Sequence, residues 1–225
     1  METSLHRELK AFYCGDPECR EVKLDGFRID AVVRGSLIEI QQASLGAIRH
    51  KTKKLLENHE VIVVKPLAAT TTILRLARRN GPVASKRTSP RHETLFDLFQ
   101  ELVHFVDVFP HPRLTLEVLL IEQQETRIPR RKRWFRARDY TLADRRLTAV
   151  LERHLFRNSA DLCRLLPEGL SDPFTTGDLA RLAGIPRWLA QKMTYCLRRS
   201  GVAAVVGKQR NTVLYTILPV DRAAA

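Results

Sequence analysis

Hydrophobic and polar residues over the first 67 positions follow patterns that predict six secondary-structure elements. Leucine and phenylalanine residues at helical spacing predict a first helix, with Ser4 as its N-cap. Short apolar runs then predict strands joined by two hairpin dipeptides, Asp25-Gly26 and Arg34-Gly35. A second helix, capped by Ser44, leads into a continuous apolar run typical of a buried parallel strand. The predicted order is helix, three antiparallel strands, helix and parallel strand, at residues 3–13, 20–24, 27–33, 36–42, 44–59 and 60–67.

The middle of the chain has weaker patterns. Residues 70–79 fit a strand and a helix equally well, and residues 80–92 read as a basic loop with Gly and Pro. Residues 93–107 have the spacing of an amphipathic helix, and residues 113–124 that of a strand. We expect both elements to extend the first sheet, which places a mixed α/β domain at residues 1–125.

Residues 172–218 predict a helix, a tight turn at Gly184-Ile185, a second helix opened by Pro186, and a β-hairpin. This order resembles a winged helix-turn-helix domain, which we assign to residues 172–220. The resemblance implies that the second helix enters the major groove of DNA. A protein-docking module is the alternative, because winged helices also serve that role. The candidate nucleic-acid contacts are Arg187, Gln191, Lys192, Tyr195, Arg198, Arg199, Lys208 and Arg210.

The charge balance points to a polyanionic partner. The chain carries 38 Lys and Arg against 25 Asp and Glu, a net charge of +13, and nucleic acid is the commonest polyanion that such a surface meets. A basic segment at residues 127–138 is a candidate phosphate strap, with Trp134 and Phe135 available for stacking. A solvated linker is the alternative. The strap residues are Arg130, Arg131, Lys132 and Arg133, within a predicted linker and connecting helix at residues 126–171.

The hairpin at residues 27–42 predicts a pair of facing carboxylates. With a two-residue Arg34-Gly35 turn, Asp30 lies opposite Glu39 and Arg28 opposite Gln41. Two carboxylates about 5 Å apart repel by about 3 kcal/mol at an effective dielectric constant of 20. A divalent cation relieves this repulsion, and Mg²⁺ is often held by two carboxylates and a substrate phosphate. The alternative is a solvated sheet face on which an Asp and a Glu happen to meet.

The element order and these residues resemble the PD-(D/E)XK nuclease superfamily, over residues 3–66. The resemblance implies a restriction-endonuclease-like mixed sheet with flanking helices, and Mg²⁺ or Mn²⁺ bound by Asp30 and Glu39. It also implies that Glu8 completes the site from the first helix. Gln41 stands where the family usually has a lysine, so the cationic role falls to Arg28, Lys51 or Lys23.

Other chemistry finds little support in the sequence. There is no Gly-rich phosphate loop, and the four cysteines, Cys14, Cys19, Cys163 and Cys196, lack the spacing of a zinc site, which favours reduced thiols. No stretch has the length of a signal peptide core or a membrane span. We therefore expect a cytoplasmic protein with no membrane partner; a homodimer is left open.

The sequence as a whole predicts metal-dependent hydrolysis of nucleic-acid phosphodiesters, as by a DNA endonuclease, with the C-terminal domain directing it to double-stranded DNA. The alternative is a non-catalytic DNA- or RNA-binding regulator that keeps a degenerate nuclease fold.

Overall fold

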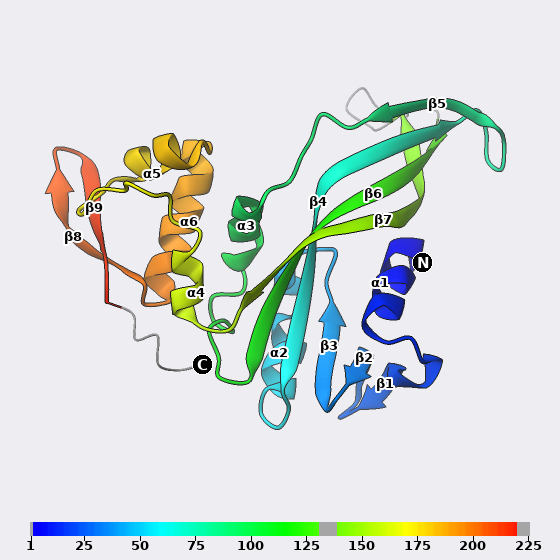
Figure 1. The fold of residues 1–225 in the computed structure, drawn as a ribbon, viewed down its shortest axis with the longest axis horizontal. Helices are drawn as coiled ribbons and strands as arrows, with labels where there is room; N and C mark the ends of the chain where they lie inside the picture. The colour runs from blue at the N-terminus through cyan, green and yellow to red at the C-terminus, as the bar shows by residue number, and fades with distance from the viewer. Residues whose placement is uncertain (1, 131–138, 220–225) are drawn as a thin grey trace.

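A seven-stranded mixed sheet forms the centre of the molecule, with helices on both of its faces (Figure 1). The computed structural model describes residues 2–130 and 139–219. The strand order is β1-β2-β3-β4-β6-β7, and β5 pairs with β4. The strands are β1 (Arg20–Leu24), β2 (Phe27–Val33), β3 (Ser36–Ile40), β4 (Val61–Leu76), β5 (Val83–Thr88), β6 (Leu114–Pro129) and β7 (Tyr140–Phe156).

The six N-terminal elements agree with the predicted order. Helix α1 (Ser4–Tyr13) precedes the antiparallel strands β1, β2 and β3, and α2 (Arg49–Leu55) connects β3 to its parallel neighbour β4. Thr3, not Ser4, caps α1, because its hydroxyl accepts the hydrogen bond from the backbone N–H of His6. Ser44 caps a 3₁₀ turn (Leu45–Ile48) that leads into α2. Another 3₁₀ turn (Pro17–Cys19) precedes β1.

Strand β4 is longer than the sequence indicated. It continues through residues 70–76 of the ambiguous segment. It pairs with β6 over most of its length, and on its other side with β3 in its first half and with β5 in its second half. β5 therefore occupies part of the predicted basic loop. The helix predicted over residues 93–107 is a 3₁₀ turn (Leu95–Asp97) followed by the short helix α3 (Leu98–Leu102), whose Phe99 is fully buried.

The predicted linker at residues 126–171 is wrong for most of its length. β6 continues to Pro129, and β7 pairs with it antiparallel along 17 residues, so the main sheet extends to Phe156. Helix α4 (Ser159–Cys163) follows. The strand escaped prediction because it carries charged residues that also suit a solvated linker, among them Arg145, Arg146 and Arg153.

The C-terminal elements have the predicted order: α5 (Thr176–Ala183), α6 (Arg187–Arg199), and a hairpin of β8 (Ala203–Gln209) and β9 (Thr212–Ile217). Thr175 caps α5, because its hydroxyl accepts a hydrogen bond from Asp178 N–H, and Gly184 ends the helix in the left-handed conformation, with φ 64°. Phe174 forms a β-bridge with Tyr215, which ties the segment before α5 to the hairpin.

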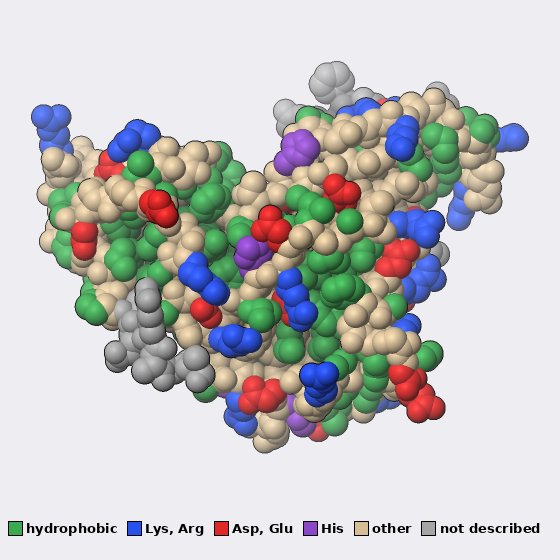
Figure 2. Space-filling model, in the orientation of Figure 1, with side chains coloured by type: hydrophobic (Ala, Val, Ile, Leu, Met, Phe, Trp, Pro, Cys, Tyr) green, Lys and Arg blue, Asp and Glu red, His purple; other side chains and the backbone are tan. Residues whose placement is uncertain are grey.

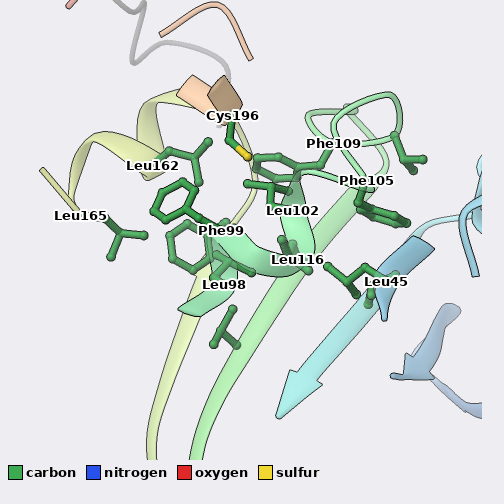
Figure 3. Close-up of a cluster of buried hydrophobic side chains, with 14 of the residues drawn as sticks. Leu45, Leu98, Phe99, Leu102, Phe105, Phe109, Leu116, Leu162, Leu165 and Cys196 are labelled. Carbon is green, nitrogen blue, oxygen red and sulfur yellow. The ribbon is translucent and has the colours of Figure 1, made fainter. Parts of the chain in front are cut away.

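The C-terminal helices share their core with the sheet. One hydrophobic cluster extends from Ile29 in β2 to Val202 after α6. Figure 3 shows Cys196 of α6 and Leu162 of α4 beside Leu102 and Phe109 of the α3 region. The side of α6 that faces α3 is buried. The C-terminal unit is therefore packed against α3 and is not joined to the sheet by a flexible linker.

Two further findings concern the cysteines and the helices. Cys14 and Cys19 form a disulfide, where the sequence favoured reduced thiols. Within residues 2–130 and 139–219, no helix is long and apolar enough to cross a membrane.

Candidate functional site: an acid pair and a basic helix surface

The β2–β3 hairpin has the predicted turn and register as far as Ala31. Val33 pairs with Ser36, Val32 with Leu37 and Ala31 with Ile38, around a turn in which Arg34 and Gly35 both have positive φ. The recorded pairing ends there, one position before the two acids would meet.

The Asp30 carboxylate continues the hydrogen bonding where the strand pairing ends. Its Oδ2 accepts a hydrogen bond of 2.8 Å from the backbone N–H of Ile40, which faces β2. On β2, Ile29 and Ala31 belong to different hydrophobic clusters, although alternate residues of a regular strand share one face. β2 therefore turns at Asp30, and a side-chain oxygen replaces the backbone carbonyl that a regular antiparallel ladder would offer.

The second oxygen of Asp30 is also engaged. His6 Nε2, on α1, lies 2.9 Å from Oδ1. Burial alone would raise the pKa of Asp30, but the His6 contact and the Ile40 N–H outweigh it and hold the pKa below its usual value. Asp30 is therefore an ionised carboxylate with a protein partner on each oxygen.

Glu39 is buried on the α2 side of β3, with 4% of its surface exposed. Lys51 Nζ of α2 lies 2.6 Å from its Oε1 as an ion pair, although the contact lacks hydrogen-bond geometry. Burial raises the pKa of Glu39 to about 7, the charge of Asp30 adds to this effect, and Lys51 opposes it. The predicted repulsion between the two acids is thus met by a lysine and by a carboxyl group that is half protonated near pH 7.

Three other predicted catalytic residues have different partners. Glu8 accepts hydrogen bonds from the backbone N–H of Leu147 in β7, at 2.6 Å, and from Arg146. The side chain of Gln41 donates to the carbonyl of Ser44 at 2.7 Å, and Arg28 forms an ion pair with Glu21. In the described chain none of these three side chains contacts Asp30 or Glu39.

Helix geometry explains why His6 rather than Glu8 meets Asp30. Two residues along an α-helix turn by about 200°, so the two side chains leave α1 in nearly opposite directions. His6 faces β2, and Glu8 faces β7. The sequence prediction matched Glu8 by residue type and missed His6, for which the helix period offered the signal.

The acids fit a metal ion only in part. In residues 2–130 and 139–219, no group of three or more His, Cys, Asp and Glu side chains could hold a metal. The Oε1 atom of Glu39 is buried without a hydrogen bond, which suits a metal ligand. Asp30 already has a protein partner on each oxygen, His6 on Oδ1 and Ile40 N–H on Oδ2, so each oxygen has one lone pair left for a metal.

Helix α6 presents a surface of basic and aromatic side chains. The exposed residues on this α6 surface are Arg187, Trp188, Gln191, Tyr195 and Arg198. Lys192 Nζ lies 5.6 Å from the centre of the Trp188 ring, within cation–π range. Trp188 was missed by the sequence prediction, although it lies one turn from Gln191 and two from Tyr195. Arg199 is turned away to Asp107, with 3.0 Å between Nη2 and Oδ1.

The remaining predicted contacts divide between the hairpin and the strap. Lys208 and Arg210 are exposed in and beside the turn that joins β8 to β9, and Figure 2 shows basic side chains at the outer tip of this hairpin. Arg130 is exposed at the end of β6. Arg131, Lys132, Arg133, Trp134 and Phe135 lie outside the described residues.

The sequence segment that contains α6 lacks acidic residues. Residues 179–220 contain no Asp or Glu and seven cations: Arg181, Arg187, Lys192, Arg198, Arg199, Lys208 and Arg210. Within the described chain, Arg187, Arg198, Lys208 and Arg210 form no ion pair with a carboxylate. The charge of this surface is therefore uncompensated by its own fold.

Comparison with known proteins places the sheet in a family. Residues 3–157 match the family model described as "Domain of unknown function (DUF8091)". The chain belongs to this family. The matched segment ends one residue after β7, so the DUF8091 domain comprises the mixed sheet with α1, α2 and α3.

A similar protein extends this likeness beyond the sheet. The chain is 32% identical over 216 residues to an "Uncharacterized protein" of Treponema pallidum (strain Nichols), across 95% of this chain and 84% of that protein. An alignment of this length must reach the C-terminal helices. No solved structure matches the chain.

Proposed function

We propose that this cytoplasmic DUF8091 protein binds double-stranded nucleic acid through the α6 surface and the tip of the β8–β9 hairpin. The observation that carries the proposal is the set of exposed cations, Arg187, Arg198, Lys208 and Arg210, which lie in an acid-free segment and have no carboxylate partner among the described residues. Unpaired cations on one surface are the electrostatic requirement for neutralising phosphates.

The order of the C-terminal elements supports the same function. Helix α5, the tight turn at Gly184, helix α6 and the β8–β9 hairpin resemble a winged helix-turn-helix domain, in which the second helix reads the major groove. Arg187, Gln191 and Arg198 lie on the exposed side of α6, opposite the side that packs against α3. Arginine and glutamine are the side chains that most often contact guanine and adenine edges.

Salt dependence of binding tests this proposal. The slope of log affinity against log salt is negative for nucleic-acid binding. We expect Arg187→Gln together with Arg198→Gln to reduce its magnitude by about 1.8 on duplex DNA, since each lost phosphate contact removes about 0.9. Lys53→Gln, at an exposed position of α2, is the matched control for loss of surface charge and should leave the slope unchanged. An unchanged slope in the α6 variant would contradict the proposal and favour a protein-docking module.

Metal-dependent hydrolysis at Asp30 and Glu39 is the second candidate function. Three observations favour it: Glu39 Oε1 is buried without a hydrogen bond, the two acids are electrostatically coupled, and Lys51 supplies beside them the cation that Gln41 lacks. In this reading, which rests on the likeness to PD-(D/E)XK nucleases, Asp30 and Glu39 hold Mg²⁺ or Mn²⁺. The ion would supply positive charge to the scissile phosphate. We rank it second because Lys51 Nζ already lies 2.6 Å from Glu39 Oε1, the oxygen that would bind the ion, and each oxygen of Asp30 has a protein partner.

Cleavage assays separate the two functions. The purified full chain is incubated with linear duplex DNA in Mg²⁺, Mn²⁺ or EDTA, beside Glu39→Gln and Lys51→Met. Cleavage that needs metal and is lost in both variants would establish the second function. Duplex binding in EDTA, with no cleavage in either metal, supports binding alone.

A further inference from the structure

The main sheet has a gap beside β4, at the point where β3 ends. Strand β4 pairs with β3 as far as Val64 and with β5 only from Thr72 onward. In the described chain, residues 65–71 of β4 therefore have β6 on one side and no strand on the other. Figure 1 shows β4, β6 and β7 continuing beyond the end of β3. Ligands of open α/β sheets bind beyond the carboxyl ends of strands, which makes this gap an expected place for a ligand site.

The segment that follows β5 closes the gap and is fixed to β4. Ser89 N–H donates to the Thr71 carbonyl at 2.8 Å, and Glu93 N–H donates to the Ala68 carbonyl at 3.0 Å. The Glu93 carboxylate accepts a hydrogen bond from Ala68 N–H in return, at 2.7 Å. The register of β4 against β6 shifts between Ala68 and Thr70, and bulges of this kind are common beside active sites.

A cavity of about 300 Å³ lies beside this gap, between the outer halves of β4, β6 and β7 and Leu5 of α1. Its polar wall includes the hydroxyl groups of Thr71 and Ser89 and the amide of Gln123. Gln123 Nε2 donates to the Thr71 hydroxyl at 3.1 Å, so the Thr71 O–H and Gln123 Oε1 can still bond to a ligand. Ligand pockets span about 300–1,000 Å³, so this cavity suits a small polar molecule.

A buried carboxylate arranges two arginines at the same cavity. Glu125 is 7% exposed, and its Oε1 accepts a hydrogen bond of 2.6 Å from Arg127 Nε. Arg145 Nε lies 3.5 Å from Oε2. Arg127 also stacks on Tyr140, with 3.9 Å between Cζ and the ring centre. Among the described residues, the Nη groups of the two arginines form no hydrogen bond. Each guanidinium is thus held at its Nε atom and has its Nη atoms available at the cavity.

The alternative explanation is an ion-pair network that only joins the ends of β6 and β7. One arginine would neutralise Glu125, whereas the cavity has both Arg127 and Arg145 beside it. Only 19% of the Arg127 side chain is exposed, and all but one of its N–H donors lack an acceptor among the described residues. Donors that are largely removed from water and lack an acceptor are costly to the fold. An anion in the cavity would supply the acceptors.

We propose that this cavity binds a small sugar that carries a phosphate monoester. The phosphate lies on the Nη groups of Arg127 and Arg145, because guanidinium groups match phosphate oxygens with paired hydrogen bonds. The sugar hydroxyls face Thr71 and Gln123. Glu125 stays on the Nε atoms and orients the arginines. This site is separate from the α6 surface and does not depend on nucleic-acid binding there.

Isothermal titration calorimetry of the full chain, in EDTA and a buffer without phosphate, tests the proposal. The probes are ribose 5-phosphate, ribose and inorganic phosphate. We expect ribose 5-phosphate to bind about 10-fold more tightly than inorganic phosphate, and ribose to show no binding, because the charge and the hydroxyls both contribute. Arg127→Lys keeps a positive charge near Glu125 but loses the planar fork, and should weaken binding of ribose 5-phosphate by about 10-fold or more. Arg146→Gln, at the next position of β7 and outside the cavity, is the matched control and should bind as the wild type does.

A phosphate monoester on a pentose also occurs at the end of a nucleic acid, and a second pair of probes distinguishes the two sources. These probes are a short single-stranded DNA with a terminal phosphate at its first nucleotide and the same strand with a hydroxyl group there. A preference for the phosphorylated strand that Arg127→Lys removes would identify a nucleic-acid end as the ligand. Equal affinity for the two strands, with ribose 5-phosphate bound, would identify a free sugar phosphate.

Ala68→Leu keeps the test decisive if Arg127→Lys does not fold. The larger side chain fills part of the cavity without changing any charge, and should also weaken binding of ribose 5-phosphate. Thermal unfolding without ligand shows which variants are folded. Wild-type affinity in a folded Arg127→Lys or Ala68→Leu variant would overturn the proposal. A wild-type chain that does not bind ribose 5-phosphate at millimolar concentration, or binds it no better than inorganic phosphate, would overturn it too.

Discussion

The acid pair and the α6 surface differ in how their charges are balanced. Asp30 has a partner on each oxygen, and Glu39 is buried against Lys51. Arg187 and Arg198 are exposed, in a segment of 42 residues without one carboxylate. The sequence predicted that the acids form a catalytic site and that the helix brings it to DNA. The contacts of the folded chain instead favour nucleic-acid binding by the helix over catalysis by the acids.

This difference separates charges that hold the fold together from charges available to a partner. A carboxylate that completes a strand's hydrogen bonding is costly to move, because its departure leaves a buried N–H unsatisfied. An exposed arginine without an acidic neighbour costs the fold little and can exchange water for phosphate. Substitutions of the acids should therefore change the stability of the fold, whereas substitutions of the exposed arginines should change binding and leave stability nearly unaltered.

The largest expected effect is the pH dependence of stability set by Glu39. Its pKa is about 7 in the folded chain against an ordinary value of 4.5, so between these values the folded state holds a proton that the unfolded state has released. The free energy of unfolding should therefore fall by about 3 kcal/mol from pH 4.5 to pH 7 on account of this group, and level off above. Glu39→Gln should remove that fall.

Urea unfolding of both proteins at pH 5, 6, 7 and 8 measures the difference. The contributions of groups common to the two chains cancel when the Glu39→Gln curve is subtracted from that of the wild type. Parallel curves would mean that Glu39 titrates normally and lies open to solvent.

Asp30→Ala should destabilise the protein by about 2 kcal/mol, because it leaves the Ile40 N–H without its acceptor. Asp30→Asn is the matched control: its amide oxygen can still accept that hydrogen bond, so the loss should be smaller. A pair of acids awaiting a metal predicts the opposite sign, since removing one charge would relieve repulsion. Denaturant midpoints without metal distinguish the two.

Glu8→Ala should cost about 1 kcal/mol through the lost hydrogen bond to Leu147 N–H in β7. It should change neither DNA binding nor any metal-dependent thermal shift. A thermal shift with Mn²⁺ that Glu8→Ala abolishes would show that Glu8 binds a metal together with the acid pair, and would contradict its structural role.

The smallest expected effect is on the stability of the edge strand β5. Lys86→Glu with Arg87→Glu should alter the free energy of unfolding by less than about 0.5 kcal/mol, because both side chains are exposed and form no ion pair among the described residues. A larger loss, measured by urea unfolding, would show that these charges serve the fold.

The sequence predicted the N-terminal elements well because their signals are local. The Asp25-Gly26 and Arg34-Gly35 turns fix the hairpin register, so the pairing of Val33 with Ser36 could be deduced. Register alone does not reveal where a ladder ends. At the break, the Asp30 carboxylate contacts Ile40 N–H and His6 of α1, and neither contact belongs to a nuclease motif.

The sequence prediction missed strands β7 and β5 for a related reason. Both are rich in arginine, and a half-exposed strand has the same composition as a solvated linker. What distinguishes them is the partner strand, β6 or β4, and that pairing is a long-range property. The acid-free segment at residues 179–220 could be read from the sequence, and it contains the surface on which the proposed function rests.

The most direct test of this account is the salt dependence of duplex DNA binding by the full chain in EDTA, with and without the paired Arg187→Gln and Arg198→Gln substitutions. We expect binding without any metal. The slope of log affinity against log salt is negative, and its magnitude should decrease by about 1.8 in the variant while Asp30→Asn leaves it unchanged. Binding that requires Mg²⁺ and fails in Asp30→Asn, with a slope indifferent to the two arginines, would contradict it.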